Sequence, residues 1–377
     1  RLHRSASAQM SRPAISIQKS GGWTFGSPSV LMMFYRVSGE LQSELTEMDE
    51  CMPHYYKITN GHGQGAETIM RAEADFMRAC FADAQIMLER AYAQIDGNGQ
   101  ENMALCCDFL AWRLSLCTSF TPRESFEQRR EALLGLHNVA WLNILQSSCA
   151  YYYALLGLPE KIPAVFREHQ LASIHFLAPG KPMMELIENQ VYLAQGEYAK
   201  VIGHSEALLG MCEAMHYALV ALHIRLQTAA AYEMLGKRET ADELLISALA
   251  AAEPDALYLP FVENYRYLKT ALTRGAGAKF AAFVRTVTPL GEDFVRRCGE
   301  KRAEGSRPAA LAGLTERESA IAALVAKRLS NREIAEQLFL SEGSVKQYIN
   351  QIYSKLLITG DVRTKRKRLA ELAAPKS

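Results

Sequence analysis

The feature that most constrains the fold of this chain is a set of three helix starts near its C-terminal end. Thr315 is followed three residues later by Glu318, and Ser330 is followed in the same way by Glu333. Each pair is a capping box, in which the hydroxyl accepts a hydrogen bond from a free helix N–H and the glutamate reaches back. Ser341 is suited to cap a third helix. The spacing therefore predicts three short helices in succession.

Apolar residues recur at helical spacing after each start. They are Ile321, Leu324 and Val325, then Ile334, Ala335 and Leu338, then Val345, Ile349, Ile352 and Leu356. Each stripe is too narrow for a fully buried helix. We therefore expect the three helices to share one small core.

The other face of the third helix is polar, with Ser344, Lys346, Gln347, Asn350 and Ser354. A helix in the major groove of DNA needs such a face, because Lys reaches guanine acceptors and Asn or Gln pairs with adenine. The pattern therefore favours a helix-turn-helix DNA-binding domain. The alternative from spacing and caps alone is a small three-helix domain with a solvated face.

The segment from about Gly313 to Arg368 closely resembles the LuxR-type helix-turn-helix family. The matching residues are Leu314, Thr315, Arg317, Glu318, Leu329, Ser330, Asn331, Glu333, Ile334, Ala335, Leu338, Ser341, Glu342, Val345, Lys346, Ile352, Lys355 and Leu356. In that family the third helix enters the major groove. The resemblance implies base contacts by Lys346, Gln347 and Asn350, and backbone contacts by Asn331, Arg332, Ser344 and Lys355.

Two departures from the family pattern carry further expectations. Leu357 stands where the family usually has a glycine, so we expect Gly360 to end a longer recognition helix. The fourth helix of the family often offers an apolar dimer face, whereas here Lys365 to Arg368 is a run of four cations. This favours phosphate contact over self-packing there, with a solvated face as the alternative.

Charge is distributed unevenly along the 377 residues, although the net charge is only +1. From Gly313 onward there are 12 Lys and Arg against 7 Asp and Glu, so this segment carries +5 and the remainder −4. A basic C-terminal module on a mildly acidic body fits a nucleic-acid-binding end joined to a sensor.

The eight cysteines form no Cys-x-x-Cys pair and no zinc-like spacing, which predicts reduced thiols and a cytoplasmic location. No run reaches the roughly 18 apolar residues of a membrane helix, so no membrane partner is expected. The sequence begins with Arg1, and we expect it to be the C-terminal piece of something longer, with processing as the alternative.

Glycines at a regular spacing organise the middle of the chain. Gly157, Gly196 and Gly236 each follow a Tyr-containing helical stretch, and they are 39 and 40 residues apart. Steps of the same length backwards reach Thr118 and Ala79 as expected helix ends. The pattern resembles tetratricopeptide repeats, which stack helix pairs into a superhelix with a concave groove.

The predicted fold is therefore all-α, with a tetratricopeptide-like helical repeat array followed by a small helix-turn-helix domain. The predicted segments are an N-terminal lead and helical segment (1–64), a repeat sensor domain (65–299), a linker (300–312) and the DNA-binding domain (313–377). This arrangement is similar to the C-terminal part of the large ATP-dependent, MalT-like branch of LuxR-type regulators. The resemblance implies that the body binds an inducer or a regulatory protein.

The register of the repeats places certain side chains on the expected concave groove. They are Asp108, Trp112, Tyr151, Gln190 and His223. Aromatic rings with polar neighbours suit a planar polar ligand or a peptide. The alternative is that Trp112 and Tyr151 fill the space between packed helices.

No phosphate-binding Gly-x-x-x-x-Gly-Lys-Ser/Thr loop, Gly-x-Ser-x-Gly elbow or His-Glu-x-x-His pair is present, so we predict no catalytic residue, no metal site and no cofactor. The predicted function is a sequence-specific transcription regulator, not an enzyme, that binds double-stranded DNA and self-associates on it. The alternative is a repeat-based adaptor that binds a protein and keeps a vestigial DNA-binding domain.

Overall fold

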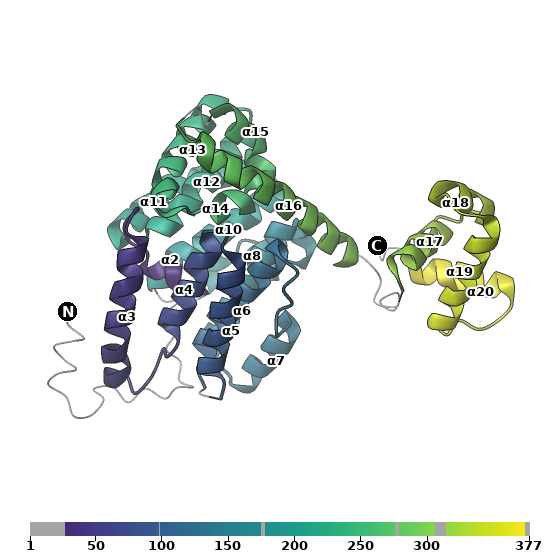
Figure 1. The fold of residues 1–377 in the computed structure, drawn as a ribbon, viewed down its shortest axis with the longest axis horizontal. Helices are drawn as coiled ribbons and strands as arrows, with labels where there is room; N and C mark the ends of the chain where they lie inside the picture. Colours follow the sequence, from purple (N-terminus) through teal and green to yellow (C-terminus); the bar gives the residue numbers. More distant parts are fainter. Residues whose placement is uncertain (1–26, 98, 175–177, 276–278, 306–313, 374–377) are drawn as a thin grey trace. The chain divides into compact units, whose positions relative to one another are not determined.

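The computed structural model describes residues 27–97, 99–174, 178–275, 279–305 and 314–373. Every regular element in these ranges is a helix, which confirms the all-α prediction (Figure 1). The chain divides into two compact units, Arg1–Cys298 and Gly299–Ser377, here called the body and the C-terminal unit. The finer segments predicted within the body stay predictions.

Long helices make up most of the body. Its first half contains α2 (Val30–Phe34), α3 (Leu41–Ile58), α4 (Ala66–Met77), α5 (Phe81–Ile95), α6 (Glu101–Cys117), α7 (Phe126–Gly135) and α8 (Val139–Leu156). Short elements follow: η1 (Pro159–Lys161), α9 (Ala164–Arg167), η2 (Leu171–Ser173) and η3 (Ala178–Gly180). The second half contains α10 (Lys181–Gln195), α11 (Tyr198–Met215), α12 (Ala218–Met234), α13 (Arg238–Ala252), η4 (Glu253–Asp255), α14 (Leu259–Glu263), α15 (Tyr265–Gly275) and α16 (Ala281–Gly305).

Consecutive helices of the body pack side by side, as α4 does with α5 and α12 with both α11 and α13. The glycines end helices as predicted: Gly157 and Gly196 are left-handed C-caps, and Gly236 has a φ of 74° just after α12. Thr118 and Ala79 also follow helix ends. Where the structure describes the chain between Gly157 and α10, it contains only short helices, so the repeat is irregular there. The specific tetratricopeptide interpretation stays a prediction.

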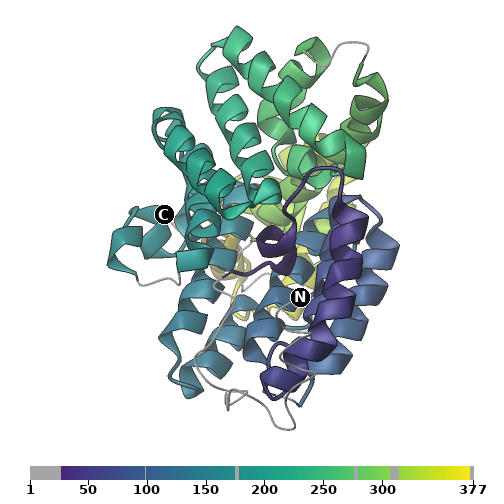
Figure 2. The same cartoon turned by 90° about the vertical axis from the view of Figure 1, so that its left-hand side faces the viewer.

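Two short helices, α2 and α14, lie inside the body. Every residue of α14 is buried, and so are the first four residues of α2. Figure 2 shows α2 enclosed between helices from the two halves of the body, and it contacts both α4 and α12. The Leu31 N–H donates to the Glu73 carboxylate (2.6 Å), and the Tyr35 carbonyl accepts from the Ala218 N–H (3.1 Å). Helices α2 and α14 are therefore part of the core of the body.

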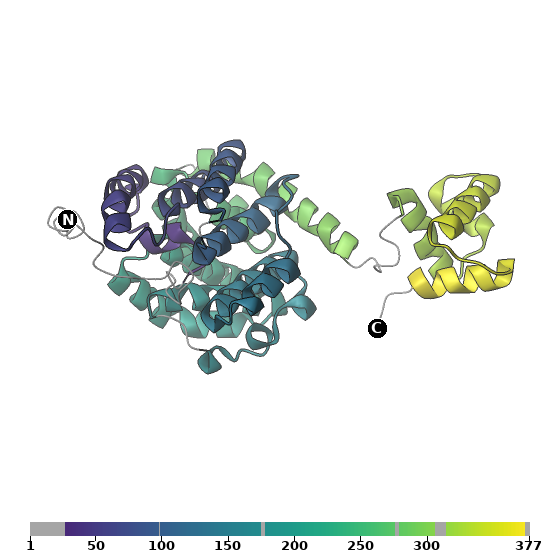
Figure 3. The ribbon, with the colours of Figure 1, turned by 90° about the horizontal axis from the view of Figure 1, so that it is seen from below.

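The C-terminal unit is built from α17 (Glu316–Ala326), α18 (Asn331–Leu338), α19 (Glu342–Lys355) and α20 (Val362–Ala373). Ile321, Ile334, Val345, Ile352 and Leu369 are all buried in one core, so the small core predicted from the apolar stripes is present and α20 completes it. Figure 3 shows α20 in yellow, and this helix packs against α17.

The segment before α17 differs from the expected linker. Helix α16 continues to Gly305, so residues 300–305 of the predicted linker are helical. Within α16, Arg297 Nε donates to Asp293 Oδ2 one turn earlier (2.6 Å). Residues 306–312, the rest of the predicted linker, lie outside the described residues.

Candidate nucleic-acid interface and the hollows of the body

The three predicted helix caps are present in the C-terminal unit. Thr315 and Glu318 form a capping box at α17, and Ser330 and Glu333 form another at α18. The Ser341 hydroxyl accepts from the Ser344 N–H (3.1 Å) at the start of α19. These caps fix where each helix begins, and they therefore set the orientation of the polar face of α19.

That polar face is exposed. The side chains of Lys346, Gln347 and Asn350 are open to solvent, while Val345 and Ile349 on the opposite face are buried. Gln347 and Asn350 also line a shallow hollow of about 470 Å³ together with Gln351, Ser354 and Lys355. One continuous face of α19 thus offers amide, hydroxyl and ammonium groups, the donors and acceptors that read base edges.

Each of the four predicted backbone-contact residues has a partner within the unit, and for Lys355 and Asn331 that partner is on another helix. Lys355 Nζ donates to Glu318 Oε2 (2.7 Å), and Asn331 Oδ1 accepts from Arg366 Nη1 (2.8 Å). Arg332 is 81% exposed and pairs only with Glu336 on its own helix (3.2 Å). Ser344 lies at the N-terminus of α19, where free N–H groups favour an anion.

The carboxylate of Glu318 ties the start of α17 to the end of α19. It is 3% exposed and also accepts from the Thr315 N–H (2.8 Å). Burial raises the pKa of Glu318, but the hydrogen bonds from Lys355 and Thr315 outweigh it and hold the pKa below its usual value. Lys355 therefore has a structural role, the pairing with Glu318, that was not predicted from the sequence.

The end of α19 corrects one expectation. The helix stops at Lys355, and Leu357 itself adopts the left-handed conformation with a φ of 50°. Gly360 therefore does not end a longer recognition helix. The Leu357 side chain is 85% exposed, because the turn directs it away from the core.

The four cations of the basic run on α20 differ in their surroundings. Arg366 Nη2 donates to the Leu329 carbonyl (2.6 Å) in addition to its bond with Asn331, so it holds α20 against the start of α18. Lys367 and Arg368 are exposed, and Lys367 lies 3.9 Å from Glu371. Only part of the run is thus free to meet phosphates.

Comparison with known proteins agrees with this geometry. The model of the GerE family, bacterial regulatory proteins of the luxR family, matches residues 312–366. Residues 312–366 form a LuxR-family domain. No solved structure matches the chain.

Two curated relatives match short segments of the chain. The transcriptional regulatory protein LnrK of Bacillus subtilis is 41% identical over 63 residues, which cover 16% of this chain and 29% of LnrK. The DNA-binding transcriptional activator DevR/DosR of Mycobacterium tuberculosis is 39% identical over 46 residues, 12% of this chain and 21% of that protein. The matched segments span less than a third of either relative. The body lies outside residues 312–366, and its likeness to the MalT-like branch stays a prediction.

The body to which the LuxR-type domain is joined buries the predicted groove residues. Asp108, Trp112, Tyr151, Gln190 and His223 are between 0 and 3% exposed. The expectation that they face an open groove is therefore corrected. Asp108 pairs with Arg129 of α7 and Trp112 packs on Phe126 of α7, whereas Tyr151 bonds to Glu263 of α14.

Most of these buried side chains have partners within the body. Asp108 accepts from the Tyr92 hydroxyl (2.7 Å), and Trp112 Nε1 donates to the Glu124 carbonyl (3.0 Å). Gln190 Oε1 accepts from Gln227 Nε2 (2.9 Å). Trp112 also lies at a hollow of about 330 Å³, where its ring contacts the Phe126 ring at 3.9 Å between centroids. The alternative that the aromatic rings fill interhelical space fits these contacts.

Tyr151 belongs to a buried ionic network that joins α6, α8 and α14. Its hydroxyl donates to Glu263 Oε2 (2.8 Å), and Arg113 Nε donates to Glu263 Oε1 (2.8 Å). Arg113 and Glu263 are each 1% exposed. His223 lies within the field of Arg113, and burial together with that charge lowers the pKa of His223 to about 3. No local sequence pattern indicates this network, because its members are far apart along the chain.

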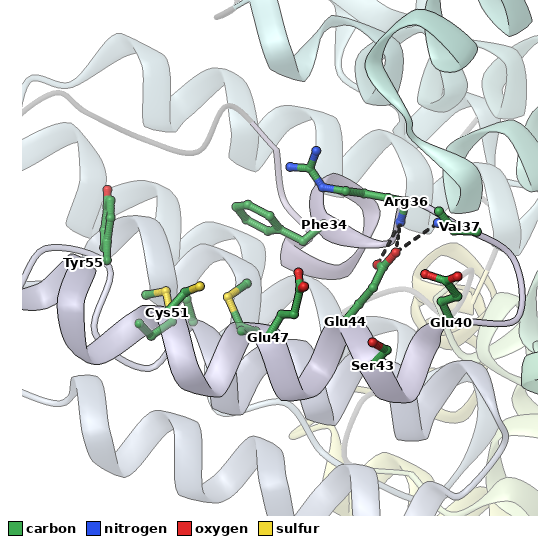
Figure 4. A pocket seen from close by; sticks show the side chains of 12 residues that line it. Phe34, Arg36, Val37, Glu40, Ser43, Glu44, Glu47, Cys51 and Tyr55 are labelled. Carbon is green, nitrogen blue, oxygen red and sulfur yellow. Dashed lines mark hydrogen bonds between the residues drawn. The ribbon is translucent and has the colours of Figure 1, made fainter. Parts of the chain in front are cut away.

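Two hollows of the body were not anticipated from the sequence. One, of about 520 Å³, lies along α3 and is lined by Phe34, Arg36, Glu47, Cys51 and Tyr55 among others. Figure 4 shows Glu47, Cys51 and Tyr55 rising from α3, with Phe34 and Arg36 across from them. The Glu44 carboxylate is already occupied there, since it accepts from the Arg36 and Val37 N–H groups.

The second hollow, of about 870 Å³, has α12 as its floor and α11 and α13 as its walls. Neither hollow shares a residue with the predicted groove. In the described part of the chain, none of the helices is both long and apolar enough to cross a membrane.

Proposed function

We propose that this protein is a transcription regulator that binds specific double-stranded DNA sequences through its LuxR-type domain. The observation that carries the proposal is the exposed polar face of α19, held in place by three helix caps and a shared core. Lys346, Gln347 and Asn350 are proposed to read base edges. Arg332 and Ser344 are proposed to contact the phosphate backbone, with smaller parts for Asn331 and Lys355 because both already bond to residues on other helices.

One such domain makes a small interface with DNA, so useful specificity normally requires two half-sites. We propose that the protein self-associates on DNA and that the body supplies the regulatory input. The charge difference between the two regions supports this division, since the segment from Gly313 carries +5 and the rest −4.

The experiment is a selection from randomised duplex DNA with the full chain, followed by affinity measurements over a range of salt. Binding should weaken steeply with salt, because each neutralised phosphate releases counterions. The triple variant Lys346→Ala, Gln347→Ala, Asn350→Ala should lose the selected sequence preference. The control Gln337→Ala, which alters an exposed polar residue on α18, should keep it.

A selection that yields no preferred sequence, or binding that is flat across salt, would contradict the proposal. It would favour the adaptor, in which the body binds a protein and the LuxR-type domain has lost its DNA contacts.

A further inference from the structure

The groove between α11 and α13 has the size of a small-molecule site. Its volume of about 870 Å³ falls within the range of such sites. Ala218, Ala221, Arg225, Thr228 and Tyr232 form its floor and recur one helical turn apart along α12. The segment after α2 borders the same groove, since Tyr35, Arg36 and Ser38 also line it.

The floor of this groove contains an arginine without a counterion. Arg225 is half-buried in the middle of α12, and its guanidinium makes no hydrogen bond or ion pair within the described residues. The fully buried Arg113 of the same body is paired in two places with Glu263. A desolvated guanidinium needs an acceptor, and its planar fork matches a carboxylate or a phosphate.

A second cation reaches the same stretch of the groove from the segment after α2. The Arg36 side chain is exposed and also has no ion pair within the described residues. Burial raises the pKa of Tyr217, and the Arg36 charge opposes this rise. Burial likewise raises the pKa of Cys212, to about 12, and the Arg225 charge opposes it. Cys212 and Tyr217 both line the groove, so the two guanidinium groups act on one local region.

The α11 wall carries the opposite charge. Glu206 and Glu213 line the groove two helical turns apart, both exposed and neither in an ion pair within the described residues. A ligand with several negative charges would meet these carboxylates, and a wholly apolar ligand would leave Arg225 desolvated and unpaired. The arrangement fits a ligand with one negative and one positive end.

We propose that this groove binds a small molecule carrying both a carboxylate and an amino group, the chemistry shared by free amino acids and short peptides. The carboxylate lies between Arg225 and Arg36, and the ammonium group faces the carboxylates of α11. The inference rests on the sensing role proposed above for its biological meaning, but the binding itself does not depend on DNA.

The test is equilibrium dialysis of the full chain against four probes, with bound material identified by mass spectrometry. The probes are a mixture of free amino acids, a tripeptide library with free ends, the same library amidated at its C-terminus, and the library acetylated at its N-terminus. We expect retention of free amino acids or of free-ended tripeptides, which distinguishes the two sources, and loss of retention on amidation. Acetylation should weaken binding.

Arg225→Gln should weaken retention about 10- to 100-fold, because it removes a charge-assisted hydrogen-bond donor. Arg36→Gln should weaken it less, since that side chain is exposed. Neither residue forms an ion pair with the part of the chain that the structure describes, so both variants should fold. The matched control is Arg130→Gln, an exposed arginine on α7 that does not line the groove.

No retention of free amino acids or free-ended peptides would overturn the proposal, as would equal retention of amidated peptides or wild-type retention by Arg225→Gln. DNA binding measured on the same preparation separates this outcome from the proposed function. If the protein binds DNA but none of the probes, only the ligand-site proposal is contradicted. If it binds a probe but no DNA, only the proposed function as a transcription regulator is contradicted.

Discussion

The body and the C-terminal unit each bury a carboxylate that accepts bonds from a cation, but the two carboxylates tie together very different stretches of chain. Glu263 meets Arg113 across 150 residues, with both side chains 1% exposed. Glu318 meets Lys355 across 37 residues, and the lysine side chain remains 43% exposed. The body is thus held by a desolvated ion pair between distant helices, whereas the C-terminal unit is held mainly by local caps.

The largest expected effect is in the body. Glu263→Gln should lower the free energy of unfolding by about 3–5 kcal/mol, because Arg113 is left as a buried charge without its partner. Urea unfolding followed by tryptophan fluorescence reports on the body, since Trp112 and Trp141 both lie there. A loss of less than about 1 kcal/mol would show that water reaches Arg113 and would break the contrast with Glu318.

Two further variants control this measurement. Arg113→Met combined with Glu263→Leu should recover much of the lost stability, because a buried ion pair is often replaceable by apolar side chains. Glu292→Gln removes a carboxylate from an exposed pair with Lys269 and should leave the unfolding midpoint nearly unchanged.

The two regions should also respond to pH in opposite directions. Burial raises the pKa of Glu73 in the body to about 7, although the Leu31 N–H and the Arg113 charge oppose this rise. An acid with a raised folded-state pKa loses its stabilising contribution as pH rises, here between about 4.5 and about 7. Glu318 has a lowered pKa, so its contribution is present above about 4.5 and is lost as pH falls below that value.

Comparison of wild type with Glu73→Gln and Glu318→Gln isolates each carboxylate from other titrating groups, among them His223. As pH rises from 4.5 to 7, the free energy of unfolding of Glu73→Gln should increase relative to that of wild type by up to about 3 kcal/mol. The relative loss caused by Glu318→Gln should instead be greatest at neutral pH, read from the NMR signals of Ile352. If the stability difference between variant and wild type changed with pH in the same direction for Glu73→Gln and Glu318→Gln, this contrast would be refuted.

A smaller effect should separate stability from DNA reading within the C-terminal unit. Asn350→Ala should cost about 1–3 kcal/mol of binding to the selected sequence but little on random DNA, since base-edge contacts carry sequence choice. Lys355→Ala should instead lower the stability of the unit, because it leaves Glu318 with only the bonds from Thr315. Equal loss on both kinds of DNA for Asn350→Ala would exclude it from base reading.

The smallest expected effects concern α20. Lys367→Ala and Arg368→Ala should change stability by no more than about 0.5 kcal/mol, and each should lower the slope of binding against salt by about 0.9 if it contacts a phosphate. Arg366→Ala should also destabilise the unit, because it removes the bonds to Leu329 and Asn331. Loss of self-association in any of these variants, measured by analytical ultracentrifugation, would show that α20 is a dimer face after all.

The sequence predicted the C-terminal unit in more detail than the body for a physical reason. The caps at Thr315, Ser330 and Ser341 involve residues three apart, so local patterns reveal them. The closing glycines of the body are local in the same sense, and they too were found. The pairing of Lys355 with Glu318 and of Arg366 with Asn331 depends on how the helices pack, and no local pattern encodes it.

The predicted groove shows the same limit more clearly. Helical periodicity predicted that Tyr151 and His223 face a groove, but it could not show which distant segments pack against the helices that carry them. Val30–Phe34 packs against α12, and Glu263 of α14 bonds to Tyr151. The position of Arg225 in the groove was not predicted from the sequence either, because a single arginine in a helix normally indicates a solvated face.

The position of α2 has a consequence for biosynthesis. Tyr35, just after this helix, bonds to Asp255, which is 220 residues later in the chain. At about 5–20 residues per second, a ribosome needs roughly 10–40 seconds to deliver that partner. For most of this interval Val30, Leu31 and Met32 have left the ribosome before α12, one of the two helices that α2 contacts, has been made. The earliest helix described is therefore among the last to settle, and the yield of soluble protein should depend on translation speed and on chaperones that shield this apolar stretch.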